Sequence, residues 1–483
     1  MLKARLAALG TRSAVPRPGG TFVTLGAWGA AGALALFATF YGLATRYWFI
    51  DERIYRRAGR LYVEQHQFLA NPQHPPLGKY LIGLSQLAFG HSEFGARLPS
   101  ALATLVTGVL LALLVARAVG QVPALVTFVA WTLLPHPGRS DDISRLAYLD
   151  TIMVAFLAFA LYAAWRWWES NSWKWAIAVG AGWGLAVATK VSALFVLPAL
   201  AVLLFQKDGF GRRAAQLTAA AVTGCAVALA TYIPFGAHAA ERVIEWMMGF
   251  QYAHARHGHR VLLAGHIYRF PPWWAQAGWL WHDNRAATIV MASSLVLAPF
   301  LVPRRISVFL LVAVLAPAAI FAFVSPILLW HWMYDWMPAM AALIGIAIGV
   351  ALTSMSWKYR FVGVALALTL VFLAGNYVRS VVDLRPTGYH SIESELATVD
   401  HPGNVVLKYG GPDNTAFDLS LYFDFARAEH TAPADTTQVA AVVVSTNWPS
   451  PYAHGVMPPV VASHPAAFRR WSHPGFIVWF RRH

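Results

Sequence analysis

Residues 51–79 read DERIYRRAGRLYVEQHQFLANPQHPPLGK and follow directly on a long apolar run. Two adjacent carboxylates, Asp51 and Glu52, stand where that run ends, and four arginines and a His-Pro-Pro-Leu-Gly-Lys turn come after them. A carboxylate close to several cations at the edge of an apolar segment is typical of a site that removes a proton beside a bound anion. We therefore interpret the rest of the chain as the scaffold that holds this stretch in place.

The composition of the chain is that of a membrane protein. Of its 483 residues, 58% are hydrophobic and 12% are charged, and the mean hydropathy is +0.50. Soluble proteins carry about 25% charged residues. The net charge of +15 is spread over the loops, which favours anionic lipid headgroups or a lipid-phosphate substrate as partners over nucleic acid. The single cysteine, Cys225, excludes an intrachain disulfide.

We expect an all-α, polytopic membrane protein with about eleven transmembrane helices, because that many apolar runs approach the length that crosses a bilayer. These runs lie near residues 22–48, 96–117, 121–136, 147–165, 174–189, 191–206, 215–236, 286–303, 306–327, 337–354 and 361–380. Residues 1–21, which carry four basic side chains, are expected to contain no cleavable signal and to form a cytoplasmic arm. Parity then places the 51–79 stretch, the loop around Asp141, residues 237–285 and the tail on the external side.

Two further segments are predicted outside the spans. Apolar residues at helical spacing after the Pro-Pro turn predict a short amphipathic helix on the outer membrane surface. Its apolar face is Leu77, Leu81, Leu84 and Ala88, and its polar face includes Lys79, Ser85 and Gln86. After the transmembrane domain, which we place at 22–381, strand-like runs at 404–409, 439–445 and 475–480 predict a small external α/β domain over 382–483.

The motifs together resemble a known family. The acid pair at 51–52, HPPLGK at 74–79, SRLAYLD at 144–150 and the lysine at 190 are similar to the protein O-mannosyltransferases, glycosyltransferase family 39. FGARLPSAL at 94–102 resembles the related aminoarabinose-transferase branch, as does the tail. Both belong to the GT-C superfamily of polyprenyl-phosphate-sugar-dependent enzymes, so the resemblance, over roughly 45–345, implies a GT-C fold with surface helices. The chain has no room between spans seven and eight for the β-trefoil of eukaryotic members.

Glycosyl transfer from a lipid phosphate requires a base for the acceptor hydroxyl and cations for the departing phosphate. Asp51 is the predicted general base, which agrees with the matching family residue. Glu52 is assigned to the same catalytic pair and is expected to orient a neighbour, because it points about 100° away on a helix. The alternative is that both acids only neutralise the nearby arginines.

The cations expected to bind the donor phosphate are Lys79, Arg145, Lys190, Arg256 and Arg260. Arg145 is also expected to pair with Asp51, and Asp150, one turn inside a span, is expected to need a partner. A structural salt bridge between loops competes with a ligand role for these residues. For Lys190 the competing interpretation is a lysine that extends to the membrane surface, and the family match favours phosphate binding.

The residues expected to contact sugar or acceptor are His74, Asp141, Asp142, Asp150, His257, His259, His266 and Tyr334. His331, Tyr334 and Asp335 lie at the outer end of the ninth and tenth spans, where the resemblance implies an aromatic residue near the donor and where anchoring at the membrane interface is the alternative. The histidines in 254–266 invite a zinc interpretation, but arginines between them disfavour a metal there. No cofactor is assigned, and a divalent metal, with Asp141 or Asp142 as its contact, is left open.

We expect an inverting membrane glycosyltransferase of the plasma membrane with its active site on the external face. It would move mannose, or another hexose or a pentose, from a polyprenyl-phosphate donor to a hydroxyl of a protein Ser/Thr, a lipid or a glycan. The alternative is a transporter or flippase of a lipid-linked sugar, for which ionisable residues near the middle of the membrane are typical. A non-catalytic subunit of the same fold is a third interpretation, which intact Asp51, Arg145 and Lys190 disfavour.

Overall fold

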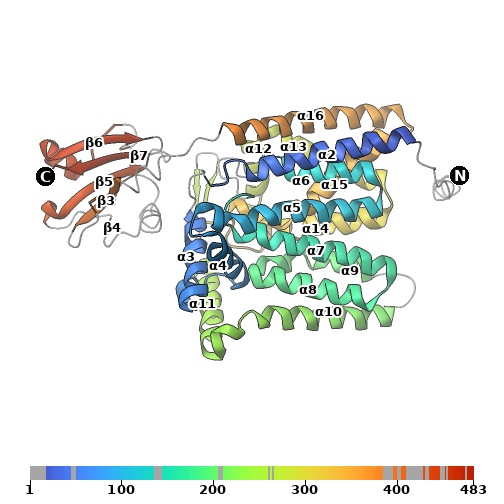
Figure 1. Cartoon of the computed structure of the whole chain (residues 1–483), viewed down its shortest axis with the longest axis horizontal. Helices are drawn as coiled ribbons and strands as arrows, with labels where there is room; N and C mark the ends of the chain where they lie inside the picture. The colour runs from blue at the N-terminus through green and yellow to red at the C-terminus, as the bar shows by residue number, and fades with distance from the viewer. Residues whose placement is uncertain are drawn as a thin grey trace.

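The structure is a computed structural model, and it describes residues 18–44, 50–134, 144–204, 210–258, 261–263, 266–383, 395–396, 398–399, 404–409, 428–429, 435–445, 452, 455–473 and 476–482. Most of it is a bundle of roughly parallel helices (Figure 1). The helices of the bundle are α2 (Pro18–Phe40), α5 (Glu93–Ala118), α6 (Gln121–Leu133), α7 (Leu149–Ser170), α8 (Trp173–Thr189), α9 (Pro198–Leu204), α10 (Phe210–Ala230), α13 (Arg285–Leu301), α14 (Arg304–Phe323), α15 (Met337–Thr353) and α16 (Trp357–Val382).

The chain is a multi-pass membrane protein. By length and composition, five helical segments of the described chain are long and apolar enough to cross a membrane, namely Glu93–Ala118, Leu149–Ser170, Phe210–His257, Arg304–Phe323 and Trp357–Val382. Five shorter apolar helices accompany them, and helices overlap every predicted span. The number of eleven crossings stays a prediction, because several bundle helices are shorter than the roughly 20 residues that a straight crossing needs.

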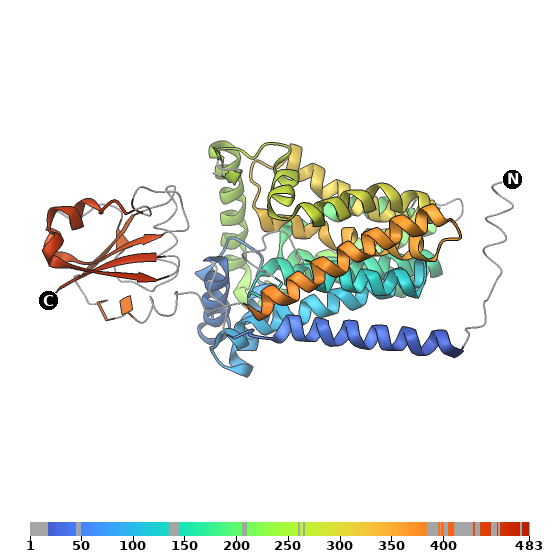
Figure 2. The same cartoon turned by 90° about the horizontal axis from the view of Figure 1, so that it is seen from above.

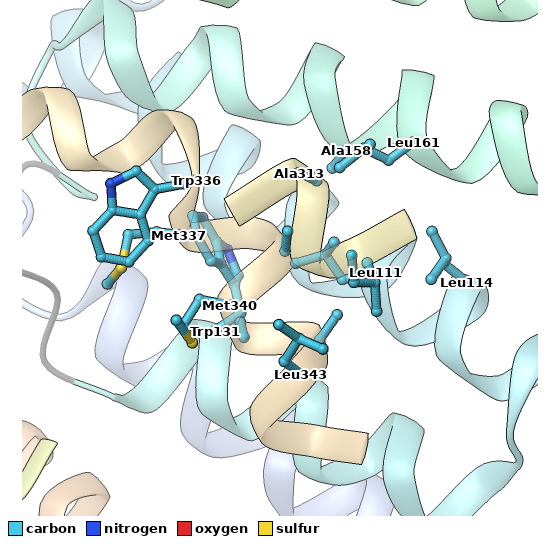
Figure 3. Packing of buried hydrophobic residues seen from close by; sticks show 14 of the residues in the cluster. Leu111, Leu114, Trp131, Ala158, Leu161, Ala313, Trp336, Met337, Met340 and Leu343 are labelled. Atoms are coloured by element: carbon cyan, nitrogen blue, oxygen red, sulfur yellow. The ribbon is translucent and has the colours of Figure 1, made fainter. Parts of the chain in front are cut away.

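Helix α15 forms the centre of the bundle. It is apolar on every side and buried along nearly its whole length, which is the pattern of a helix surrounded by other helices. It packs against α5, α6, α13, α14 and α16. Figure 3 shows Met340 and Leu343 of α15 close to Trp131 of α6, with side chains of α5, α7 and α14 completing the same core.

The remaining helical elements gather at one end of the bundle. They are α3 (Ile50–Gln65), η1 (Phe68–Ala70), α4 (Leu77–Phe89), η2 (Val191–Val196), η3 (Ile233–Phe235), α11 (Gly236–His257), α12 (Ala275–Asp283) and η4 (Trp330–Asp335). Helices α3 and α11 run across the bundle axis in both views (Figures 1 and 2). Strands β1 (Val261–Leu263) and β2 (His266–Tyr268) form an antiparallel hairpin between α11 and α12. The described part of the predicted loop 237–285 is therefore largely helical.

Helix α4 exists as predicted, but two residues of its predicted polar face are buried in the protein. Lys79 and Gln86, predicted on a water-facing side, are buried, and the Gln86 amide donates to the carbonyl oxygen of Arg56 on α3 at 3.0 Å. Leu84 and Leu87 are instead 52% and 61% exposed. Gln86 turns inward because it finds a hydrogen-bond partner on α3, and Lys79 because it binds Asn71 and His74 in the segment before α4. The apolar side chains are left on the outer side of the helix.

The C-terminal strands form one five-stranded sheet in the order β4-β3-β5-β7-β6. The strands are β3 (Val405–Tyr409), β4 (Ala428–Glu429), β5 (Val439–Ser445), β6 (Phe468–His473) and β7 (Phe476–Arg481), with η5 (Thr436–Gln438), α19 (Pro459–Ser463) and η7 (Pro465–Ala467) between them. β3 runs parallel to β4 and β5, and β7 runs antiparallel to β5 and β6. Three strands match the predicted runs, whereas β4 and β6 were not predicted. The sheet lies beyond the end of the bundle at which α3 and α11 lie (Figure 2).

A buried ion pair fixes α3 to the bundle. Arg97, at the start of the second turn of α5, donates from Nε to Glu52 Oε1 at 2.6 Å and from a terminal nitrogen to Glu52 Oε2 at 3.0 Å. Glu52 Oε1 also accepts from the backbone N–H of Ala147 at 3.1 Å, and Arg97 donates to the carbonyl oxygen of Leu43 at 2.8 Å. One pair thus joins the end of α2, the start of α3, α5 and the segment before α7.

Breaking this pair from one side is expected to destabilise the protein. Glu52→Gln leaves a buried guanidinium without its counter-ion, and Arg97→Met leaves a buried carboxylate, so each is expected to cost about 3–5 kcal/mol. The double variant leaves no unpaired charge and should cost less than the sum. Thermal and denaturant unfolding of the purified protein in detergent checks this, and additive losses would contradict it.

Glycines set the separation of α3 and α4. A Cβ on Gly59 would lie 2.6 Å from the carbonyl oxygen of Lys79 and 2.8 Å from the amide nitrogen of Gly83, so the two backbones are in direct contact. Gly59→Ala is expected to push α4 away at a cost of about 1–3 kcal/mol. Gly249→Ala on α11 is the matched control, because a Cβ there meets nothing within 4 Å. It should be neutral or stabilising by up to about 1 kcal/mol in the same unfolding measurement.

Candidate functional site

A buried ion pair lies where α7 begins and α8 ends. Lys190 is the C-terminal cap of α8, and Asp150 is in the first turn of α7. Lys190 Nζ lies 2.5 Å from Asp150 Oδ1, and both side chains are nearly inaccessible. Lys190 is therefore the partner that Asp150 was expected to need. The ammonium also lies 5.3 Å from the centre of the Trp332 ring, close enough for a cation–π interaction.

A second buried carboxylate belongs to the same cluster. Asp335, the last residue of η4, accepts a hydrogen bond at Oδ1 from the Ser192 hydroxyl of η2 at 3.2 Å. Burial raises the pKa of Asp335 to about 7, with Asp150 adding to the rise and Lys190 opposing it. The charge of Lys190 thus acts on two carboxylates. Asp150 forms the direct ion pair, and Asp335 is present in both its charged and its neutral form near pH 7.

Four aromatic and imidazole rings line the same region. Tyr55 of α3 lies edge-on to His74 at 5.9 Å and to Tyr148 at 6.1 Å between ring centres, and Tyr148 lies 5.6 Å from His331. Burial, and then the charge of Lys190, lowers the pKa of both histidines well below the usual value. Both imidazoles are therefore neutral at pH 7, and a neutral imidazole both donates and accepts a hydrogen bond.

Asp51 lies at the half-buried edge of this cluster. It is in the first turn of α3, one turn before Tyr55, where the partial positive charge of the helix N-terminus stabilises a carboxylate. Burial raises the pKa of the Tyr55 hydroxyl most, and the charges of Asp51 and Asp150 raise it further. Tyr55 is thus close to both carboxylates and connects the predicted base to the Lys190–Asp150 pair.

Glu52 and Lys79 have environments that differ from the predicted ones. The Glu52 carboxylate is held by Arg97, which suits the expected role of orienting a neighbour and not direct proton transfer. Lys79 is fully buried and donates to the Asn71 carbonyl oxygen at 2.5 Å, the Asn71 amide oxygen at 3.3 Å and the His74 carbonyl oxygen at 2.7 Å. The predicted phosphate contact is not supported for Lys79, because its ammonium donors bind protein oxygens and hold the turn that carries His74.

Arg145 and Tyr334 are both buried, in different surroundings. Arg145 precedes α7 and donates to the carbonyl oxygen of Tyr41, at the end of α2. The segment around it is held by α5, where the Thr104 hydroxyl donates to the carbonyl oxygen of Ser144 at 2.7 Å. Tyr334 lies 6.0 Å from the Trp131 ring in the apolar core of the bundle, so packing accounts for much of its environment.

The predicted basic residues after α10 are spread over a different surface. Arg256 and His257 are exposed at the end of α11, and His266 is exposed on β2. The hairpin nevertheless borders the cluster, because Leu263 and Tyr268 pack in one apolar group with Trp332. Four predicted site residues, Asp141, Asp142, His259 and Arg260, lie outside the described residues.

The described side chains include no group of three or more His, Cys, Asp or Glu residues placed to hold a metal ion. The structure brings Asp51, His74, Asp150 and Lys190 to one end of the bundle, as the sequence predicted. It adds Tyr55, Tyr148, Ser192, His331 and Asp335. The spacing of four residues from Asp51 to Tyr55 on one helix face is the signal that was available for Tyr55.

Part of the chain matches a family known from its sequence pattern. Residues 73–238 match the family described as dolichyl-phosphate-mannose-protein mannosyltransferase. Among curated proteins, the polyprenol-phosphate-mannose–protein mannosyltransferase of Mycolicibacterium smegmatis is 30% identical over 165 residues, 29% of this chain and 31% of that protein. The protein of the same name from Mycobacterium tuberculosis is 29% identical over 197 residues, 35% of this chain and 37% of that protein. The chain thus matches about a third of the length of these curated relatives.

The fold is similar to solved structures over a much longer range. ArnT from Cupriavidus metallidurans bound to undecaprenyl phosphate aligns with a TM-score of 0.62 and 15% identity, covering 94% of this chain and 98% of ArnT. The archaeal oligosaccharyltransferase AglB from Archaeoglobus fulgidus, in complex with an inhibitory peptide and a dolichol-phosphate, aligns with a TM-score of 0.52 and 12% identity, covering 89% and 70%. The chain therefore has the GT-C fold, with the overall architecture of ArnT and, over residues 73–238, the sequence pattern of the protein O-mannosyltransferases.

Proposed function

We propose that the protein is a polyprenyl-phosphate-sugar-dependent glycosyltransferase that transfers a sugar to a hydroxyl group. The observation that carries this proposal is the cluster of Asp51, Tyr55, Asp150 and Lys190 at one end of an apolar bundle. A lipid-linked phosphate keeps its chain between apolar helices and its reactive carbon at the membrane edge, which is where these groups lie. His74, Asp150 and Lys190 also fall within the stretch that matches the mannosyltransferase family.

The reaction places a base and a cation on opposite sides of the anomeric carbon. Asp51 takes the proton of the acceptor hydroxyl, and the oxygen attacks that carbon as its bond to the phosphate oxygen breaks. The electron pair of this bond leaves with the polyprenyl phosphate, and the configuration of the sugar is inverted. The ammonium of Lys190, oriented by Asp150, stabilises the charge that develops on the phosphate. Arg145 and the exposed basic residues of α11 are proposed to bind the phosphate more peripherally.

The proposal extends to the membrane that holds the protein, the face on which the active site lies, and the acceptor. The N-terminal basic arm favours a cytoplasmic N-terminus, which puts the cluster and the C-terminal sheet on the external face of the plasma membrane. The names of the curated relatives favour a protein as acceptor and mannose as sugar. The acceptor group proposed here is a Ser/Thr hydroxyl. A transporter or flippase is disfavoured, because the buried acid–base pairs Asp150–Lys190 and Glu52–Arg97 lie at helix ends, not midway along helices.

Asp51→Asn is expected to lower transfer by about 10²–10⁴-fold, because the amide cannot take the proton of the acceptor. The measurement is sugar transfer by the purified protein from polyprenyl-phosphate mannose to a Ser/Thr peptide and to a lipid acceptor, with and without chelator. Donor binding should be unchanged, since Asp51 acts on the acceptor. Asp383→Asn, an exposed aspartate at the end of α16, is the matched control. Full activity of Asp51→Asn at equal membrane abundance would remove Asp51 as the base.

The raised pKa of Asp335 makes a specific contribution to pH-dependent stability. Its pKa is about 7 in the folded protein and near 4 in an unfolded chain. Between about pH 4 and pH 7 the folded protein binds more protons at this site than the unfolded chain does. Its contribution to the free energy of unfolding therefore falls as pH rises through this range. The lowered pKa values of His74 and His331 act in the opposite direction. The informative quantity is therefore the difference in stability between the Asp335→Asn variant and the unsubstituted protein.

In thermal unfolding scans from pH 4 to 8, Asp335→Asn should become more stable relative to the unsubstituted protein as pH rises. A difference between the two proteins that is flat across this range would contradict the raised pKa.

A further inference from the structure

Three buried polar atoms around Lys190 have no hydrogen-bond partner among the described residues. They are Asp150 Oδ2, His331 Nδ1 and Asp335 Oδ2. Each of the two carboxylates is held by the protein through one oxygen only: Lys190 binds Asp150 Oδ1, and Ser192 binds Asp335 Oδ1. All three side chains are at least nine-tenths buried.

This arrangement is costly unless a ligand completes it. A buried polar atom without a partner lowers stability, so folded proteins keep few of them, and those they keep tend to have a role. Here three occur in one cluster: the charge of Lys190 acts on both His331 and Asp335, and the charge of Asp150 acts on Asp335. A chance packing defect does not explain three partly satisfied groups from α7 and η4 around one ammonium.

The chemistry of the three atoms specifies the ligand. Carboxylate oxygens accept hydrogen bonds, and an imidazole nitrogen accepts or donates one. A ligand that fits must therefore offer several hydroxyl groups close together. It must also lie next to the cation proposed for the phosphate. The sugar of a sugar phosphate meets both conditions.

We propose that Asp150, His331 and Asp335 form the subsite for the sugar of the donor and bind its hydroxyl groups. This rests on the proposed function, because the sugar is located through the phosphate at Lys190. The residues of η4 then determine which sugar is used, while Lys190 binds any polyprenyl phosphate.

The subsite favours a neutral sugar over an amino sugar. Asp150 is already neutralised by Lys190 at 2.5 Å, so a second ammonium would be repelled by the first. Asp335 is the remaining acid, and because burial raises its pKa to about 7, much of it is protonated at neutral pH and offers little charge to an ammonium. A neutral hexose donates hydrogen bonds to both acids without adding a charge to the cluster.

The test compares lipids that differ only in the sugar. Binding of undecaprenyl phosphate, undecaprenyl-phosphate mannose and undecaprenyl-phosphate 4-amino-arabinose is measured with the full-length protein in lipid nanodiscs. The mannosyl lipid is expected to bind more tightly than both others. In Asp335→Leu and in His331→Phe, the preference for the mannosyl lipid over the bare phosphate should fall about tenfold, the effect of one lost hydrogen bond to a charged or buried group. Affinity for the bare phosphate should stay the same.

These variants also separate a binding role from a structural one. Each replaces a partly satisfied buried polar group by an apolar one of similar size, so the midpoint of thermal unfolding should stay constant or rise. A loss of sugar preference in an equally or more stable protein is not a folding defect. Asp383→Leu and His282→Phe, which change exposed residues, are the matched controls and should leave the preference unaltered.

The outcomes are distinct. The subsite is overturned if both variants weaken binding of the mannosyl lipid and of the bare phosphate equally, or if the preference for the mannosyl lipid does not change. The proposed function would then remain intact. If the unsubstituted protein binds the amino sugar lipid more tightly than the mannosyl lipid, the preference for a neutral sugar is overturned. Failure of the unsubstituted protein to bind any of the three lipids would overturn the proposed function and this inference with it.

Discussion

A carboxylate or an ammonium at the end of an apolar helix is costly to bury unless a partner of opposite charge is buried with it. The contact of Lys190 with Asp150 meets this requirement and joins α7 to α8 at the end of the bundle where the other functional groups gather. Asp335, His331 and His74 all owe part of their protonation behaviour to Lys190. Without this pair, the cluster would be an unstable collection of buried polar groups.

The Glu52–Arg97 pair meets the same requirement in a different way. Its carboxylate has both oxygens bound, and its guanidinium reaches a backbone carbonyl as well. A group whose hydrogen-bonding capacity is used up holds elements together, and a group with capacity to spare can bind a ligand. Of the two neighbouring acids of the opening motif, Glu52 positions α3, whereas Asp51 lies at the half-buried edge of the site. Lys79 belongs with Glu52, since it binds three protein oxygens and fixes the turn that carries His74.

The surroundings of the site follow from the same balance of polar and apolar groups. Helix α4 turns Gln86 toward α3 and Lys79 toward Asn71 and His74, and it presents leucines outward. The hairpin after α11 packs Leu263 and Tyr268 with Trp332, whose ring faces Lys190. The segment that carries the exposed basic residues is thus physically connected to the cluster, although those residues themselves lie on the outer surface.

The sequence by itself determined the membrane class, the position of the apolar helices and the two motifs that meet in the site, because hydrophobic run length and charged residues at run ends are local properties of the chain. It also located Asp51, Asp150 and Lys190 at one end, since span parity carries that information. It could not assign partners. Whether Lys79 faces water or the protein, whether Glu52 is bound by Arg97, and whether His331 and Asp335 join Asp150 depend on contacts between residues far apart in the chain. Only the tertiary structure decided these, because the fate of a buried polar group is set by which donor or acceptor packs against it.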